Sequence, residues 1–336
     1  MNTITLAHGS GGQAMQQLIG QLFMRAFANP WLDEQEDQAR LPLAELTARG
    51  DRLAFSTDSY VIDPLFFPGG DIGKLAVCGT ANDVAVSGAL PRWLSCGFIL
   101  EEGLALATLE RVVNSMAATA REAGIEIVTG DTKVVPRGAA DKLFINTAGL
   151  GAIPTAIHWS AASLTPGDLL LVSGTLGDHG ATILNLREEL GLEGALSSDC
   201  ALLSPLIEAL RPIRGVKALR DATRGGVNAV MHEFAASSGC GMALQEKALP
   251  LKPSVRGVCE LLGLDALNFA NEGKLVIGVA REAAQQALET MKAHPLGRDA
   301  AIVGEVTASA GVRLCGLYGV KRTLDLPHSE PLPRIC

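Results

Sequence analysis

The sequence is poor in aromatic and charged residues and has no excess of basic ones. Only 4% of its 336 residues are aromatic and 19% are charged, and 28 Lys and Arg against 36 Asp and Glu give a net charge of −8. This balance argues against nucleic acid or an anionic membrane as the main partner, although a local basic pocket is compatible with it. The hydrophobic content of 48% excludes disordered and collagen-like classes, and the length suits two domains.

The seven cysteines include no CxxC pair, and their number is odd. Neither a zinc site nor a disulfide framework is therefore indicated. The first residues lack the basic and apolar regions of a secretory signal. The longest uncharged stretch, 143–167, is interrupted by Pro154 and His158, so it reads as a strand and a loop and not as a membrane span. These absences predict a protein of the reducing cytoplasm.

Strand-like and helix-like segments alternate along nearly the whole chain, which predicts mixed α/β layers. In the first half we expect strands at 53–56, 125–128 and 143–150 and helices at 73–88 and 104–122. A linker rich in Ser, Thr, Pro and Gly follows near 160–167. The second half should contain strands at 169–172, 275–279 and 302–306 and helices at 181–190, 200–210, 226–237 and 282–293. We therefore predict an N-terminal domain over 1–160, a C-terminal α/β domain over 161–320 and a tail over 321–336.

Three aspartates occupy positions that suit a metal site. Asp58 and Asp131 follow predicted strands, and Asp83 lies in a helix of small residues beside Asn82. Carboxylates at strand ends face the crevice in which α/β proteins bind ligands. Oxygen ligands with few histidines nearby favour Mg²⁺, which often joins protein carboxylates to nucleotide phosphates. The alternative is three unrelated turn or cap residues, and the sequence alone leaves both open.

Three glycine-rich stretches precede predicted helices, namely HGSGG at 8–12, SGTLGDHG at 173–180 and DATRGG at 221–226. Backbone amides at the start of a helix can bind a phosphate. None of the stretches matches a Walker A loop, and each alone is typical of an ordinary turn. Their occurrence three times in one chain favours a phosphate-bearing ligand.

Three further side chains are candidates for chemistry. Lys133 would place an ammonium group near Asp131, and Glu272, just before the strand at 274–279, is a candidate base. From these residues alone, an ordinary solvated lysine and a turn carboxylate are the favoured interpretations. Cys336 ends a Pro-rich segment that cannot be helical, so we expect an extended, mobile tail with an exposed thiol. Ten extended residues reach about 33 Å, far enough to carry that thiol in and out of a pocket.

Taken together, these motifs resemble the HypE family of hydrogenase-maturation carbamoyl dehydratases. That family lies in the superfamily of aminoimidazole-ribonucleotide synthetase, thiamine-monophosphate kinase and selenophosphate synthetase. The resemblance covers essentially the whole chain, and the terminal PRIC at 333–336 distinguishes HypE from the rest. The other matching segments are 8–12, 56–89, 130–134, 173–180, 221–227 and 271–274. The resemblance implies a two-domain α/β fold of the synthetase type, whose N-terminal domains pair between two chains into a shared barrel-like core.

The resemblance also implies an activity. Members accept a carbamoyl group from the carbamoyltransferase HypF on the C-terminal cysteine, dehydrate it to a thiocyanate with ATP, and pass the cyanide to iron on the HypC–HypD complex. It makes Cys336, Glu272 and Lys133 candidate catalytic residues and Asp58, Asp83 and Asp131 candidate Mg²⁺ ligands. The implied ATP-binding residues are those three aspartates with Gly9, Gly11, Gly12, Thr57, Asn82, Thr132, Asp221, Gly225 and Gly226.

Other functions of the superfamily fit less well. Selenophosphate synthesis expects a reactive cysteine near the N-terminus, whereas the first cysteine here is Cys78. Phosphoribosyl cyclo-ligase or thiamine-phosphate kinase activity would leave Cys336 unexplained. A non-catalytic scaffold whose tail only docks on a partner is disfavoured, because the aspartates, Lys133 and Glu272 are all present.

Overall fold

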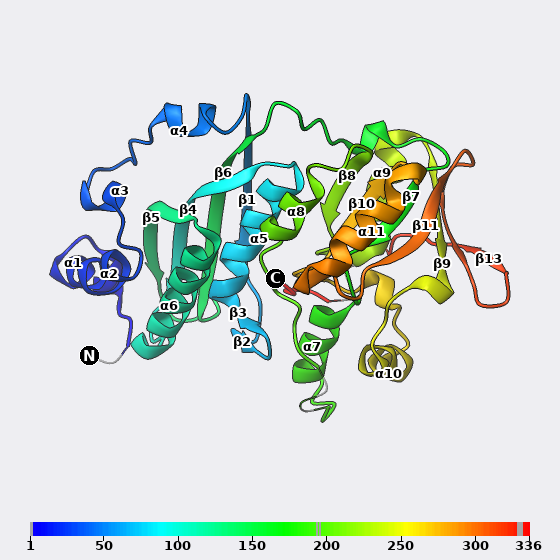
Figure 1. Ribbon diagram of the computed structural model, residues 1–336. Coiled ribbons are helices and arrows are strands. Elements are labelled where there is room, and N and C mark those ends of the chain that lie inside the picture. Colours follow the sequence, from blue (N-terminus) through cyan, green and yellow to red (C-terminus); the bar gives the residue numbers. More distant parts are fainter. Residues whose placement is uncertain (1–2, 193, 195, 328–331) are drawn as a thin grey trace.

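The computed structural model describes residues 3–192, 194, 196–327 and 332–336, which form two layered domains side by side (Figure 1). The N-terminal domain is built on a four-stranded sheet in which only the β4–β5 pair is parallel. In spatial order its strands are β1 (Arg52–Tyr60), β6 (Leu143–Ile153), β4 (Leu90–Glu101) and β5 (Glu126–Val135).

Two helices, α5 (Ile72–Val86) and α6 (Leu106–Ala123), cover the inner face of this sheet. The apolar residues of α6 recur at helical spacing and are buried, and Gly124 ends the helix in the left-handed conformation with φ +64°. Helix α5 is buried on almost all sides, because it packs against the sheet, α6 and the C-terminal domain. Its small residues permit this close packing. The shorter elements are α1 (Gln13–Leu18), a π-helical turn at Ile19–Phe23, α2 (Met24–Ala26), α3 (Pro30–Asp33), α4 (Leu43–Thr47), β2 (Phe66–Phe67) and β3 (Gly70–Asp71).

The C-terminal domain is built on a seven-stranded sheet that is antiparallel except for the β12–β9 pair. In spatial order the strands are β13 (Lys321–Thr323), β12 (Val312–Cys315), β9 (Gly241–Gln245), β11 (Ala301–Thr307), β7 (Leu169–Val172), β10 (Leu275–Val279) and β8 (Val216–Asp221). Helix α9 (Gly226–Ser238) packs on one face, and α8 (Ser204–Leu210) and α11 (Ala284–Ala293) pack on the other. Two further helices, α7 (Asp178–Arg187) and α10 (Pro253–Leu262), contact each other.

Most of the expected elements are present, but several boundaries differ. The long helices expected at 73–88, 104–122 and 226–237 and the strand at 275–279 are confirmed as α5, α6, α9 and β10, whereas α10 was not expected. Asp58 and Asp131 lie inside β1 and β5 and not after strands, because both strands continue through their polar residues. Since Lys321–Thr323 form β13 of the large sheet, the tail begins beyond Thr323 and not at 321.

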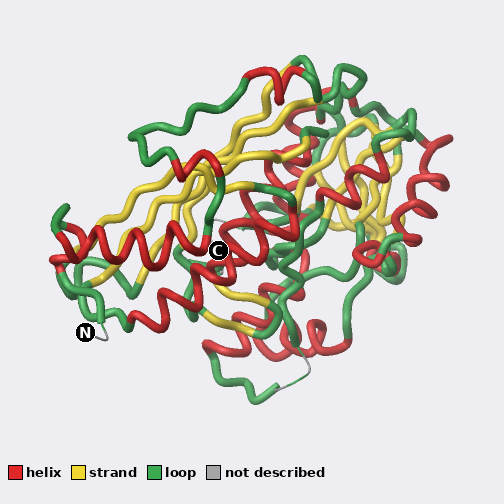
Figure 2. Tube along the Cα trace, turned by 60° about the vertical axis from the view of Figure 1, so that its left-hand side comes forward, coloured by secondary structure: helices red, strands yellow, loops and turns green. Residues whose placement is uncertain are grey.

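The end of the chain is docked and not exposed. Leu332 and Ile335 are each 2% exposed and Cys336 is 7% exposed. In both overall views the C-terminus lies in the middle of the molecule, among elements of the two domains (Figures 1 and 2). The expectation of an exposed thiol on an extended tail is therefore wrong for 332–336, because apolar burial holds this segment in place. The rest of the expected mobile stretch, 328–331, lies outside the described residues.

Helix α5 also carries a polar link between the domains. The Asn82 side chain, 1% exposed, donates from Nδ2 to the Ala201 carbonyl at 3.0 Å and accepts from the Leu203 N–H at 2.8 Å. Ala201 and Leu203 precede α8 of the C-terminal domain. Both ends of the amide are thus engaged by the other domain. None of the helices in the described part of the chain combines the length and the apolar character of a membrane span.

Replacing Asn82 by Ala should lower the free energy of unfolding by about 2 to 4 kcal/mol, because two buried backbone groups lose their partners. Urea unfolding followed by circular dichroism would measure the change. Asn114→Ala, on the exposed side of α6, is the matched control and should cost far less. Equal stabilities for the two variants would show that Asn82 does not link the domains energetically.

Candidate functional site

Four carboxylates meet Cys336 in a cavity between the two domains. Asp58 comes from β1, Asp83 from α5, Asp221 from the end of β8, and Glu272 from the loop before β10. The remaining lining residues are Gly79, Thr223 and Arg224. With Cys336 docked the cavity measures about 10 Å³, which is room for about one water molecule. The structure therefore brings together five of the expected site residues, namely Asp58, Asp83, Asp221, Glu272 and Cys336.

The four carboxylates of the cavity differ in whether each of their oxygens has a hydrogen-bond partner. Asp83 accepts from the Ser56 hydroxyl at 2.8 Å, and Asp58 accepts from the Ser59 N–H at 2.8 Å. By contrast, Oδ2 of Asp221 and Oε1 of Glu272 are buried and unpaired. Buried acceptors without a donor are costly, so this arrangement is suited to receive a cation or a hydrogen-bond donor.

The grouping of carboxylates shifts their protonation. Burial raises the pKa of Asp83, and the neighbouring charge of Asp58 raises it further. Burial and the nearby Asp83 raise the pKa of Asp221 to about 7. Burial, with Cys200, Asp199 and other acidic groups nearby, holds the pKa of Glu272 well above its ordinary value. A carboxylate with a raised pKa is a stronger base once ionised, as general-base catalysis requires.

The backbone around Glu272 is fixed by a second acidic residue that the sequence did not single out. Asp199 accepts from the Glu272 N–H at 3.1 Å and pairs with Lys274 at 3.3 Å. A Cβ atom on Gly273 would lie 1.9 Å from the Asp199 carbonyl oxygen, so only glycine permits this close approach. Lys274 belongs to the NEGK motif, which could have revealed it, whereas nothing in the sequence near Asp199 marks it.

Asp131 does not join Asp58 and Asp83 within one chain, so the expected metal triad is wrong for the single chain. Asp131 on β5 lies at the same level of the sheet as Ser59, the neighbour of Asp58 on β1. Strands β4 and β6 lie between them, so the two backbones are three inter-strand spacings, about 14 Å, apart. Side chains alternate along a strand, and Asp131 is exposed on the outer face of the sheet, away from α5 and α6. Lys133 shares that face and pairs with Asp131 at 2.7 Å, which lowers the Asp131 pKa.

Thr57 is exposed on the same outer face and donates to the Thr147 carbonyl at 3.0 Å. Thr132 points the opposite way and is buried. Asn82, as described above, is engaged in linking the domains. None of these three side chains lines the carboxylate cavity.

The glycine motifs divide between two places. Gly9 ends a 3₁₀ turn (Leu6–Gly9) that contacts β5, and a Cβ atom on Gly9 would lie 2.9 Å from Val134. Gly11 and Gly12 follow in the short loop before α1. Gly225 and Gly226 follow Arg224 of the cavity and begin α9, both with positive φ. Only this second pair adjoins the carboxylates. Thr223 and Arg224, in the same DATRGG run, were missed although the motif was noted.

The donor set fits Mg²⁺ bound together with phosphate oxygens and not by protein alone. Within the described ranges, no three His, Cys, Asp or Glu side chains lie close enough together to hold a metal ion. Mg²⁺ commonly takes one or two protein carboxylates and completes its shell with water and phosphate. The unpaired oxygen of Asp221, beside Asp58 and Asp83, meets that requirement.

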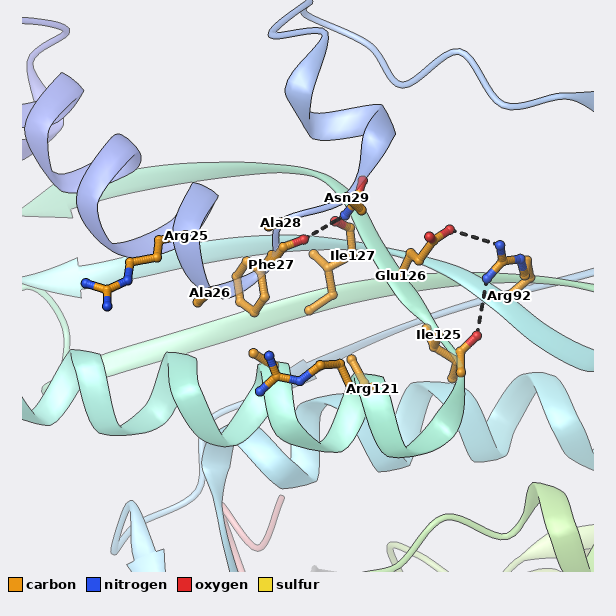
Figure 3. A pocket seen from close by; sticks show the side chains of 13 residues that line it. Arg25, Ala26, Phe27, Ala28, Asn29, Arg92, Arg121, Ile125, Glu126 and Ile127 are labelled. Atoms are coloured by element: carbon orange, nitrogen blue, oxygen red, sulfur yellow. Dashed lines mark hydrogen bonds and ion pairs between the residues drawn. The ribbon is translucent and has the colours of Figure 1, made fainter.

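A larger cavity lies elsewhere, on the N-terminal domain between α2, α6 and β5 (Figure 3). It measures about 330 Å³ and its lining includes Arg25, Arg92 and Arg121. Arg92 is paired with Glu126 at 3.1 Å. No residue expected to bind ATP or metal lines this cavity.

Asp221→Asn should stabilise the protein at alkaline pH. Because the folded-state pKa is raised, the stability linked to Asp221 is present below about pH 4 and is lost as the pH rises through about 7. The variant should therefore gain on the order of 2 to 4 kcal/mol over wild type at pH 8 and nothing near pH 4. Urea unfolding at several pH values would test this, with the exposed Asp33→Asn as control. A gain that is independent of pH would contradict it.

Comparison with known proteins identifies the family. Residues 35–153 and 165–315 match the N-terminal and C-terminal domains of the AIR synthase related proteins. The chain is 79% identical to the carbamoyl dehydratase HypE of Escherichia coli K12, over the full length of both.

Solved structures support the same family assignment. A hydrogenase maturation protein HypE crystallised with ATP is 48% identical, with a TM-score of 0.94 over 99% of this chain and 100% of that one. HypE from a HypE–HypF complex is 46% identical, with a TM-score of 0.81 over 92% of this chain and 99% of the other. The two-domain α/β architecture, the carboxylate cavity and these likenesses converge: the chain belongs to the HypE family of carbamoyl dehydratases.

Proposed function

We propose that the protein dehydrates a carbamoyl group carried on Cys336 to a thiocyanate, using ATP, and so supplies the cyanide ligand of a NiFe-hydrogenase iron centre. The observation that carries the proposal is the placement of Cys336 among Asp58, Asp83, Asp221 and Glu272. A thiol that served only to dock on a partner would have no need of a cavity lined by unpaired carboxylates.

The chemistry requires activation of the amide oxygen, because that oxygen is a poor leaving group. In the proposed reaction the carbamoyl oxygen attacks the γ-phosphorus of ATP and ADP departs. Loss of the two N–H protons and cleavage of the C–O bond then release phosphate and form the C≡N bond. The two protons leave with the phosphate as H₂PO₄⁻, so the sum of S-carbamoyl plus ATP giving S-cyano, ADP and dihydrogen phosphate balances in atoms and charge without an oxidant.

Glu272 is the proposed base for the nitrogen protons. It shares the cavity with Cys336, has an unpaired buried oxygen, and its raised pKa suits proton abstraction. The Asp199 carboxylate fixes the Glu272 backbone and so limits where the side chain can lie. Arg224, at the cavity wall, adds positive charge near the place where phosphate charge would develop.

We propose that Mg²⁺ binds beside Asp58, Asp83 and Asp221, held by one or two of these carboxylates together with phosphate oxygens, with Asp221 in the position first assigned to Asp131. Mg²⁺ bound there would offset the charge of the triphosphate. Gly225 and Gly226 would let the backbone of the α9 start approach the nucleotide. The ATP complex of a relative at 48% identity supports nucleotide binding by this fold.

We further propose that two chains pair through the outer face of the N-terminal sheet. Leu53, Phe55 and Ile99 project from it with 56%, 68% and 44% of their surface exposed. Apolar side chains grouped in this way on a sheet face usually mark an interface. Pairing there would form the shared barrel-like core and would place Thr57, Asp131 and Lys133 at the contact between chains. Their expected roles at the nucleotide, and those of Gly9, Gly11, Gly12 and Thr132, would then depend on the second chain.

The proposed partners are HypF, as carbamoyl donor, and the HypC–HypD complex, as cyanide acceptor. A HypE–HypF complex is known for a relative at 46% identity, which supports the first. The reducing cytoplasm is the proposed location, because it supplies ATP and keeps thiols reduced.

Cys336→Ser should abolish thiocyanate formation while leaving ATP binding and the fold intact. The protein would be incubated with carbamoyl phosphate, HypF and ATP, and the C-terminal peptide would be weighed by mass spectrometry, with ATP affinity measured by calorimetry. Cys315→Ser, a half-buried cysteine of β12, is the control and should retain the cyano adduct. If wild-type protein gains no mass on this peptide, the scaffold interpretation is favoured.

Phe55→Asp should shift the protein from dimer to monomer and raise the dimer dissociation constant at least about tenfold, because a charge would be buried at the interface. Light scattering during gel filtration would report the mass. Tyr318→Asp, which alters an aromatic side chain that is 96% exposed on the other domain, should leave the mass unchanged. A wild-type chain that is monomeric at all concentrations would refute the pairing.

A further inference from the structure

The docked tail is held largely through its backbone. Arg187, the last residue of α7, donates from Nη1 to the Pro333 carbonyl at 2.7 Å and from Nη2 to the Arg334 carbonyl. Its Nε donates to the Asp63 carbonyl at 2.7 Å, a contact with the N-terminal domain that does not involve the tail. The N-terminal domain thus fixes the planar guanidinium of Arg187, which presents two parallel donors to the successive carbonyls of the tail.

The next carbonyl is bound from the other end of the same helix. His179 is fully buried, and its Nε2 lies 2.8 Å from the Ile335 carbonyl oxygen while its Nδ1 lies 2.7 Å from the Ser198 hydroxyl. A carbonyl only accepts, so the hydrogen must be on Nε2, and Nδ1 accepts from Ser198. The Cys200 N–H donates to the same Ser198 oxygen at 3.1 Å, which orients the hydroxyl. Burial lowers the pKa of His179, in keeping with this neutral form.

The terminal carboxylate, that of Cys336, accepts from the Val61 N–H at 2.9 Å. The Arg334 side chain donates in return to the Val61 carbonyl at 2.8 Å and pairs with Asp141 at 2.8 Å. Three successive carbonyls, from Pro333 to Ile335, and the terminal carboxylate are therefore bound by groups of the two domains. Ile335 contributes a buried apolar side chain to the same docking.

We propose that His179 and Arg187 are positioning residues that hold the tail so that the Cys336 sulfur stays in the carboxylate cavity. The importance of that position rests on the proposed function, but the docking itself does not. Because both side chains bind carbonyls and not the sulfur, the same contacts are available whether the sulfur is a thiol or carries a carbamoyl or cyano group. Helix α7 would then hold the tail in the same way throughout the dehydration step.

The test is the rate at which iodoacetamide alkylates Cys336 in the full-length protein, followed by mass spectrometry of each cysteine peptide. Arg187→Gln should alkylate Cys336 at least about fivefold faster than wild type, because the fork of donors is lost and the tail is released more often. Arg121→Gln, an exposed arginine of α6, should match wild type. Equal rates at Cys336 in the Arg187 variant and wild type would overturn the proposal.

Cys78 and Cys96, both buried, report on the fold in the same samples. They should stay unreactive in Arg187→Gln. If they were alkylated faster in step with Cys336, Arg187 would serve the stability of the domains, and its role on the tail would be refuted. Because the assay needs no turnover, a wild-type protein that forms no cyano adduct would end the proposed function without affecting this result.

His179 is tested by a conservative pair. His179→Gln keeps a donor near the position of Nε2 and should restore most of the protection of Cys336, whereas His179→Ala should not. With the substrate-charged protein, His179→Ala and Arg187→Gln should lower kcat for thiocyanate formation and leave the KM for ATP unchanged. A rise in that KM with unchanged kcat would place these residues at the nucleotide and contradict a role in holding the tail.

Discussion

The structure depends on the burial of several carboxylates at the contact between two domains. Asp83, Asp221 and Glu272 are removed from water with few donors to satisfy them, and their raised pKa values record the cost. Such a group is tolerated only where other contacts hold it together. Here these are the buried helix α5, the Asn82 link and the apolar contacts of the tail. The contact between the domains therefore holds buried carboxylates that favour the binding of a cation and of a ligand with many hydrogen-bond donors.

The tail completes this arrangement. Its apolar anchors and its hydrogen-bonded carbonyls place Cys336 next to the unpaired oxygens, so that the carrier and the proposed base lie in one compartment. Because Cys336 is only 7% exposed in this position, loading of the proposed carbamoyl group by a partner would require the tail to leave its docked position.

The sequence allowed the layers, the long helices and most of the cavity residues to be predicted, because helical periodicity and glycine-rich motifs are local signals. Its failures have physical causes. Asp131 was grouped with Asp58 because both were read as following strands, but residue alternation places them on opposite faces of one sheet. Asn82 adjoins Asp83 on α5, but neighbours on a helix point in different directions, and its side chain is engaged by the C-terminal domain. The docking of Cys336 depends on contacts with α7 and Val61 that are remote in sequence and leave no local pattern.

One consequence follows from the position of β1 at the border of its sheet. A nine-residue border strand offers an unpaired row of backbone donors and acceptors, here next to the exposed Phe55 and Leu53. Such a strand is a template for the addition of foreign strands and for aggregation. Association of two chains would shield it, so that assembly would protect the newly made protein from misassembly as well as shape its chemistry.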